Sequence, residues 1–260
     1  MSNEIFEFKI GHFQCMAIRD GDANDWDRNI LLINTGQQHV LVDTGNGQEV
    51  TPKGFLLDRL RSMHISPTEI DVVILSHADW DHIGGAVDEN ANAVFPQARY
   101  ILARAEWDFW SSKPERLQPN TDYDEAVRRY GQQIPELRLA QLQRNLELIK
   151  PGAEIVTGIR AIDAPGHTPG YTVISVTSDH EQLLFIGDLL YDPHDIETPD
   201  WYSVFDFDPS LVVETRRRVF EQAAREQSLL MAYHLSFPGL GYVSQHGSGW
   251  CWQSYENHLM

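Results

Sequence analysis

The stretch 75–85, with the sequence Leu-Ser-His-Ala-Asp-Trp-Asp-His-Ile-Gly-Gly, constrains the fold more than any other part of the chain. It follows the apolar, β-branched run 72–75, which is typical of a short buried strand, and its glycines predict a tight turn into a helix at 83–87. Side chains after such a strand project from a loop at the sheet edge, where chemistry is usually placed on a rigid scaffold. Four of these side chains have metal-ligand chemistry: His77, Asp79, Asp81 and His82.

A polar surface loop is the alternative interpretation of this stretch. Metal binding is favoured because imidazole and carboxylate groups crowded this closely have few other roles. Further ligand-type residues follow other predicted strands. His167 lies in a loop with two prolines and two glycines, which should present it rigidly, while Asp188 and His234 come after strand signals at 182–186 and 229–233.

Alternating and β-branched segments predict strands on both sides of the motif, and capping residues predict helices between them. One helix is expected to start at Thr51-Pro52 and another to run from Asp208-Pro209 to Gln227. The predicted strands lie within 4–19, with a turn at 11–12, and at 29–34, 39–42, 71–75, 154–162, 171–176, 182–186 and 229–233.

Residues 105–150 have a different composition, with aromatic residues followed by polar, helix-prone sequence. Apolar residues recur at roughly helical spacing across 136–149, which predicts a helix there. We therefore expect a helical insertion at about 105–150, longer than an ordinary loop, that could cover a site or form a dimer contact.

Composition limits the partners and the compartment. A length of 260 residues and 42% hydrophobic residues fit one soluble globular domain over 1–260. A formal charge of −18 argues against nucleic acid and against anionic membranes, because both need clustered Lys and Arg. The absence of a signal-like N-terminus and the two cysteines, Cys15 and Cys251, read as free thiols, predict a cytoplasmic protein.

Taken together and in this order, the motifs resemble those of the metallo-β-lactamase superfamily over nearly the whole chain. The usual pattern there is His-x-His-x-Asp-His, then a Gly-His loop, a Gly-Asp loop and a final His. The resemblance implies an α+β fold, a four-layer αββα sandwich with a two-metal centre at one sheet edge. The implied ligands of the first ion are His77, Asp79 and His167, and those of the second are Asp81, His82 and His234, with Asp188 bridging.

Two other segments extend the resemblance. Asp43, before Thr44-Gly45, matches a family element whose aspartate supports the metal-binding loop through hydrogen bonds. The segment 234–241 is similar to the branch of the superfamily that contains methyl parathion hydrolase and related esterases and lactonases. Tyr191, three residues after Asp188, has the spacing of the tyrosine that assists quorum-quenching lactonases, although it could equally be an apolar wall residue.

Asp79 departs from the family pattern, because most members have histidine at this position. A carboxylate is a harder, negatively charged ligand, which favours iron or manganese relative to zinc, the metal we otherwise expect. It could also weaken the first site and leave a mainly mononuclear enzyme. The alternative function is therefore an iron-dependent, dioxygenase-like oxidoreductase on the same fold. A binding module without catalysis is a third, weaker alternative.

The favoured prediction is a metal-dependent hydrolase, in which a metal-bound hydroxide cleaves an ester, lactone or phosphotriester bond of a small, neutral, partly apolar substrate. Asp81 or Asp188 would orient the nucleophile, and Tyr191 would donate a hydrogen bond to the developing oxyanion. His194 is a candidate accessory acid or base. The candidates for an apolar substrate pocket are Trp26, Trp107, Trp110, Trp201 and Phe205.

Overall fold

The computed structural model describes residues 4–21, 27–48, 53–112, 125–198 and 200–255. The described residues form two seven-stranded sheets, each with its strands in the order of the chain. The first sheet consists of β1 (Ile5–Ile10), β2 (Phe13–Arg19), β3 (Asn29–Asn34), β4 (His39–Val42), β5 (Val72–Ile74), β6 (Arg99–Ala103) and β7 (Leu146–Ile149). The second consists of β8 (Glu154–Val156), β9 (Ile159–Asp163), β10 (Thr172–Ser178), β11 (Glu181–Gly187), β12 (Leu229–Ala232), β13 (Leu240–His246) and β14 (Gly249–Ser254).

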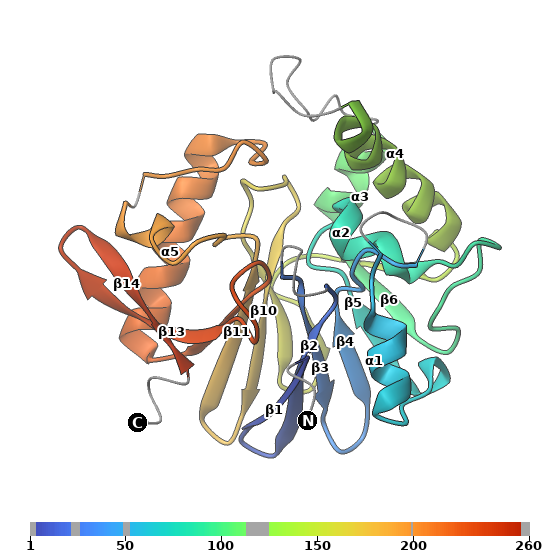
Figure 1. Cartoon of the computed structure of the whole chain (residues 1–260). Helices are drawn as coiled ribbons and strands as arrows, with labels where there is room; N and C mark the ends of the chain where they lie inside the picture. Colours follow the sequence, from blue (N-terminus) through green and yellow to red (C-terminus); the bar gives the residue numbers. More distant parts are fainter. Residues whose placement is uncertain (1–3, 22–26, 49–52, 113–124, 199, 256–260) are drawn as a thin grey trace.

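Helices cover the outer face of each sheet. Figure 1 shows α1 to α4 on the outer side of the first sheet and α5 on the outer side of the second, with the sheets face to face between them. The predicted αββα sandwich is thereby confirmed. The helices are α1 (Leu56–Ser62), α2 (Trp80–Ile83), α3 (Arg104–Ser111), α4 (Glu125–Leu142) and α5 (Pro209–Glu226), with short 3₁₀ helices at Pro67–Glu69, Gly84–Ala86 and Asp195–Glu197.

The central strands of the second sheet are buried on both faces. Ile174 and Phe185 belong to the core between the two sheets, whereas their neighbours Val173 and Leu184 belong to a second core under α5. Because successive side chains of a strand point to opposite faces, two-sided burial needs a nearly continuous apolar run. This is why the sequence signals for β10 to β12 were strong.

Several elements differ from the sequence prediction. Helix α4 ends at Leu142, and Leu146–Ile149 is strand β7, which pairs in parallel with β6, a strand that was not predicted. The predicted helix over 136–149 was therefore wrong at its end, because a short apolar run next to an open sheet edge pairs as a strand. The segment 154–162 is two strands rather than one, with Gly158 at φ +82° in the turn between them.

The helix after the metal motif begins before the glycines and not after them. Helix α2 spans Trp80–Ile83, and Gly84–Ala86 forms only a 3₁₀ turn. A Cβ atom on Gly84 would lie 2.3 Å from the backbone oxygen of Asn46. The glycine pair therefore allows the turn after β4 to pack directly on the motif. The predicted helix start at 51–52 lies outside the described residues.

Candidate metal centre

The ligand-type residues meet at one edge of the sandwich. His77 follows β5, His167 lies between β9 and β10, and Asp188 comes directly after β11. His234 follows β12, which pairs in parallel with β11, so the carboxyl ends of both strands reach the same edge. The fold thus brings together residues that lie far apart along the chain.

Two groups of side chains could each hold a metal ion. Within each group, one ligand atom per residue lies within 4.8 Å of the ligand atoms of the other two residues. The first group is His77, His167 and Asp188, and the second is Asp81, His82 and His234. These are six of the seven residues expected as ligands.

Asp188 lies between the two groups. Its Oδ1 atom is 3.0 Å from Nε2 of His82, and its Oδ2 atom is 3.6 Å from Nε2 of His167 and 3.4 Å from Nε2 of His234. A carboxylate that reaches histidines of both groups has the geometry of a bridging ligand. Asp79, the seventh residue, lies with the first group, since its Oδ2 atom is 3.7 Å from Nε2 of His77 and 3.4 Å from Nε2 of His167.

The centre contains buried polar atoms whose hydrogen-bonding capacity is unused. Among the described residues, Nε2 of His77 makes no hydrogen bond, and Nε2 of His82 and Oδ1 of Asp188 make none of suitable geometry although they lie 3.0 Å apart. Buried polar atoms without a partner cost free energy, and native proteins seldom leave them so. Cations held by the two groups would satisfy all three atoms, so the residues present fit a metal centre.

Each of the four histidines is held by its other ring nitrogen. Nδ1 of His82 lies 2.8 Å from Oδ2 of Asp43, and Nδ1 of His77 lies 3.0 Å from Oγ of Ser76. Asp43 also accepts hydrogen bonds from the backbone and hydroxyl of Ser76, as its sequence context suggested. These bonds fix the ring orientations and turn Nε2 toward the centre.

The remaining two histidines use partners that the sequence analysis did not identify. Nδ1 of His167 lies 2.9 Å from Oδ1 of Asp206, and Nδ1 of His234 lies 3.1 Å from the backbone oxygen of Asp27. Asp206 is itself fixed by the backbone N–H of Ser203, which donates to Oδ2 over 2.6 Å. A lone aspartate in an irregular loop has no sequence signal of its own, so Asp206 could be found only from the structure.

Burial and neighbouring charges shift the pKa values of the ligand side chains. Burial lowers the pKa of His77, and the neighbouring His82 adds to that shift, so His77 is neutral. Burial also lowers the pKa of His82, but Asp188 and Asp43 outweigh it and raise the pKa well above its usual value. Burial raises the pKa of Asp188, while His82 and His234 bring it well below its usual value.

Tyr191 lies at the centre, next to the bridging carboxylate. Its hydroxyl donates to Oδ2 of Asp188 over 3.0 Å, and its ring stacks on that of His234 at 5.2 Å between centroids. Burial and the charge of Asp188 raise the pKa of Tyr191, so the hydroxyl stays protonated. The rings of Trp201 and Phe205 lie 6.1 and 6.3 Å from the Tyr191 ring.

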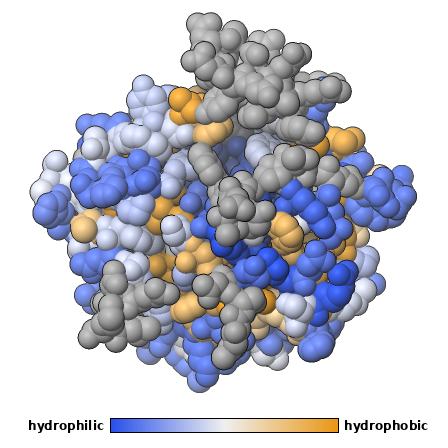
Figure 2. Space-filling model, viewed as in Figure 1, coloured by the Kyte–Doolittle hydropathy of each residue, from blue (hydrophilic) through white to orange (hydrophobic). Residues whose placement is uncertain are grey.

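The segment 200–208 combines a buried carboxylate with exposed apolar side chains. It carries Asp206 as well as three of the largest exposed apolar side chains, Tyr202, Val204 and Phe207. The ring of Phe207 lies 4.9 Å from that of Phe109 in α3. On the face shown in Figure 2, hydrophobic residues are otherwise scattered among hydrophilic ones.

The other aromatic candidates lie elsewhere or outside the described residues. Trp107 and Trp110 line a cavity of about 580 Å³ between α3 and α4, and Trp110 is buried in the core. Trp26 lies outside the described residues. His194 is exposed, with Nδ1 3.1 Å from Oε1 of Glu197, which makes it part of a surface pair. This surface pair gives no support to His194 as an accessory acid or base.

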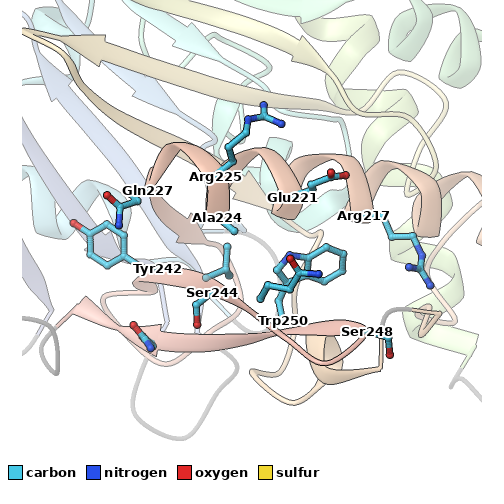
Figure 3. Close-up of a pocket in the computed structure, with 12 residues that line it drawn as sticks. Arg217, Glu221, Ala224, Arg225, Gln227, Tyr242, Ser244, Ser248 and Trp250 are labelled. Carbon is cyan, nitrogen blue, oxygen red and sulfur yellow. The ribbon is translucent and has the colours of Figure 1, made fainter.

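The most spacious cavity shown lies away from the ligand cluster. It measures about 880 Å³ and is lined by α5 and by the hairpin of β13 and β14 (Figure 3). Arg225 points away from the hairpin in this view, and Arg217 lies near the middle of α5. Arg217 and Arg225 each pair with an acidic residue, Asp200 and Glu226, so the cavity does not concentrate positive charge.

The comparison with family models agrees with the geometry. The model described as the metallo-beta-lactamase superfamily matches residues 23–234. The chain belongs to the metallo-β-lactamase superfamily. A probable metallo-hydrolase of Mycobacterium tuberculosis is 28% identical over 182 residues, which are 63% of this chain and 56% of that protein. The chain thus spans just over half the length of this superfamily relative.

Lactonases are among the similar members of the superfamily. An N-acyl homoserine lactonase of Bacillus thuringiensis is 25% identical over 224 residues, which are 78% of this chain and 79% of the lactonase. The solved structure of AidC, a dizinc quorum-quenching lactonase in complex with a product, matches this chain with a TM-score of 0.87 and 28% identity. The match covers 96% of this chain and 97% of the AidC chain. AbOPH, a hydrolase with 23% identity and a TM-score of 0.84, shows the same fold over 98% of both chains.

Proposed function

We propose that this protein is a two-metal hydrolase that opens the lactone ring of a small acylated substrate. The observation that carries the proposal is the position of Asp188, a member of the first ligand group whose carboxylate also reaches His82 and His234 of the second and accepts from the Tyr191 hydroxyl. The lactonase activity of the Bacillus thuringiensis relative and of AidC favours a lactone over the phosphotriester and simple ester that the sequence also suggested.

The proposed metal ligands are His77, Asp79, Asp81, His82, His167, Asp188 and His234. Zinc is the favoured metal, since AidC is a dizinc enzyme and histidine nitrogen suits zinc. Asp79 adds a hard carboxylate to the first group, so manganese or iron are tested alongside zinc. When bound, divalent ions lower the pKa of water and polarise a carbonyl oxygen.

The protein groups divide the remaining work. Asp81 and Asp188 accept hydrogen bonds, so each can orient an attacking water toward the carbonyl carbon of the substrate. Tyr191 keeps its proton and can donate a hydrogen bond to the carbonyl oxygen as negative charge develops there. Trp201 and Phe205 pack next to Tyr191 and would exclude water from one side of the substrate.

The substrate is proposed to be neutral and partly apolar. The acidic chain, with a formal charge of −18, suits a neutral molecule better than a polyanion. Exposed apolar side chains of 200–208 offer contact for an acyl tail. Four expectations stay predictions: membership of the methyl parathion hydrolase-like branch, a cytoplasmic location, a homodimer, and the absence of nucleic-acid and membrane partners. None of the described helices is long and apolar enough to cross a membrane.

The deciding experiment is a substrate screen on protein of known metal content. Acyl homoserine lactones, aryl esters and phosphotriesters are assayed with zinc-, manganese- and iron-loaded protein, and oxygen consumption is recorded in parallel. We expect lactone hydrolysis that rises with metal content and no oxygen uptake. Oxygen uptake by the iron form without hydrolysis would instead establish the oxidoreductase alternative, and hydrolysis that is independent of metal content would refute the proposal.

A further inference from the structure

A buried carboxylate outside the ligand set holds two ligand-bearing loops together. Glu106, in the first turn of α3, is fully buried. Its Oε1 atom accepts from the backbone N–H of Ala78 over 3.0 Å and from Nε1 of Trp110 over 2.9 Å. Its Oε2 atom accepts from the hydroxyl of Thr168 over 2.6 Å and from the backbone N–H of Gly170 over 3.2 Å.

The partners of Glu106 are direct neighbours of the first ligand group. Ala78 stands between His77 and Asp79, and Thr168 follows His167. We propose that Glu106 is a positioning residue that sets the spacing between the 77–79 loop and the 167–170 loop, and thereby the affinity of the first metal site. This inference rests on the proposed metal centre.

The hydrogen-bonding chemistry of the site is specific to a carboxylate. An ionised carboxylate only accepts hydrogen bonds, and its two oxygens can accept four, which matches the four donors around Glu106. A glutamine would place an NH₂ group against two of those donors and leave them without an acceptor. Burial raises the pKa of Glu106, whereas the hydrogen bonds from Thr168, Ala78 and Trp110 oppose that shift.

The packing of α3 leaves little freedom at this point. A Cβ atom on Gly170 would lie 2.0 Å from the backbone nitrogen of Glu106, so the helix start touches the histidine loop directly. The second ligand group is held by different residues, with Asp43 on His82 and Asp27 on His234. A change at Glu106 should therefore act on one site and not on the other.

The test measures the two metal dissociation constants of the full chain by competition with a chromophoric chelator, using zinc. Asp79→Ala and Asp81→Ala identify which constant belongs to which site. Glu106→Gln should weaken the first site by about 10- to 100-fold and change the second by less than about threefold, as expected for a residue that orients ligands. Trp110→Phe, which removes a donor that is in neither ligand loop, should leave both constants within about threefold.

Two further variants serve as a stability control and as a milder alternative to Glu106→Gln. Val219→Ala, in the core under α5, lowers stability without touching the centre and shows what a purely structural loss does to the constants. If Glu106→Gln does not fold, Thr168→Val removes only one of the four bonds and should shift the first constant in the same direction. Unchanged constants in Glu106→Gln, or equal changes at both sites as in Val219→Ala, overturn the inference. A wild-type chain that binds no zinc, manganese or iron overturns the proposed function as well.

Discussion

At the scale of single residues, the four histidines show how the centre is prepared for a cation. Each ring is tied through Nδ1 to a different part of the chain, at Ser76, Asp43, Asp206 and Asp27. The rings therefore do not need to reorient when an ion binds, so the loss of side-chain conformational entropy on binding is small. The same arrangement predicts which substitutions should remove bound metal and which should lower only the catalytic rate.

Replacing Asp188 should abolish metal binding at both sites, because its carboxylate contacts histidines of both groups. We expect Asp188→Ala to lose bound metal and to lower lactone hydrolysis by at least about 1000-fold. Metal content is measured by elemental analysis after gel filtration. Asp192→Ala, at an exposed aspartate four positions further along, is the control. Full activity and unchanged metal content in Asp188→Ala would contradict the assignment.

Removing the Tyr191 hydroxyl should affect catalysis without removing metal. Tyr191→Phe keeps the ring stack on His234 and loses only the donor near Asp188. We expect kcat to fall by about 10- to 100-fold, with metal content and KM nearly unchanged. Tyr242→Phe, in the cavity of Figure 3, should leave kcat unchanged. A kcat of Tyr191→Phe equal to wild type would make Tyr191 a wall residue.

The two cysteines should differ sharply in reactivity. Both are free, but burial raises the pKa of Cys15 from 9.0 to about 12, while Cys251 is half-buried. At pH 8 only about one Cys15 in ten thousand is a thiolate, and the thiolate is the reactive form. A thiol reagent at pH 8 should label one cysteine in the folded chain and two in urea, with mass spectrometry locating the first on Cys251. Early labelling of Cys15 would show that its strand opens readily.

At the scale of elements, α5 is the helix that its own sequence determines most clearly. Asp208 caps α5 by accepting from the backbone N–H of Leu211 over 3.0 Å, and Pro209 occupies the first turn. These local signals, with an apolar face, were enough to predict the helix almost to the residue.

Loss of that cap gives a stability test. Asp208→Ala should lower the free energy of unfolding by about 1 kcal/mol, because one N-terminal N–H group of α5 loses its acceptor. Glu214→Ala, on the exposed face of the same helix, should change it by less than about 0.5 kcal/mol. Both values come from urea unfolding of metal-loaded protein. Equal values for the two variants would mean that Asp208 contributes nothing as a cap.

Elements whose identity depends on distant partners were harder to predict. The hairpins and the buried strands β5 and β10 to β12 were predictable because their own residues alternate or are continuously apolar. Strand β7 was mistaken for helix because its apolar residues fit either period, and only pairing with β6 decides. The strands β13 and β14 were missed because they lack a strong alternating pattern.

The candidate site divides in the same way. The seven proposed ligands stand in motifs that can be recognised along the sequence, and the structure brings all of them together. Glu106 and Asp206 could not be predicted, because their roles arise from contacts with loops 62 and 39 positions away. Sequence patterns identify groups that bind an ion more readily than the groups that hold those ligands in place.

At the scale of the whole molecule, the centre lies where both sheets end, so a bound ion links the two halves of the sandwich. The backbone already joins them there, because Ser76 accepts from the backbone N–H of Thr172 over 3.0 Å. An ion that binds only the folded chain adds stability through mass action.

Metal removal should therefore lower thermal stability. With free zinc at about 100 times its dissociation constant, the gain is about 2.7 kcal/mol per site, and excess chelator should remove it. We expect a fall of several degrees in Tm on chelation and full recovery when zinc is restored, measured by calorimetry. Asp188→Ala serves as the control, and its Tm should not respond to chelator. An identical Tm with and without chelator in the wild-type chain would argue against a bound ion.

The segment 200–208 carries both exposed apolar side chains and the carboxylate that orients a histidine of the centre. Tyr202, Val204 and Phe207 face outward, while Asp206 in the same short stretch steers the His167 ring. Substitutions that reshape this stretch should therefore also change the orientation of the His167 ring. Under the proposed function, variants of this stretch that accept bulkier substrates will need compensating substitutions elsewhere to keep the wild-type kcat.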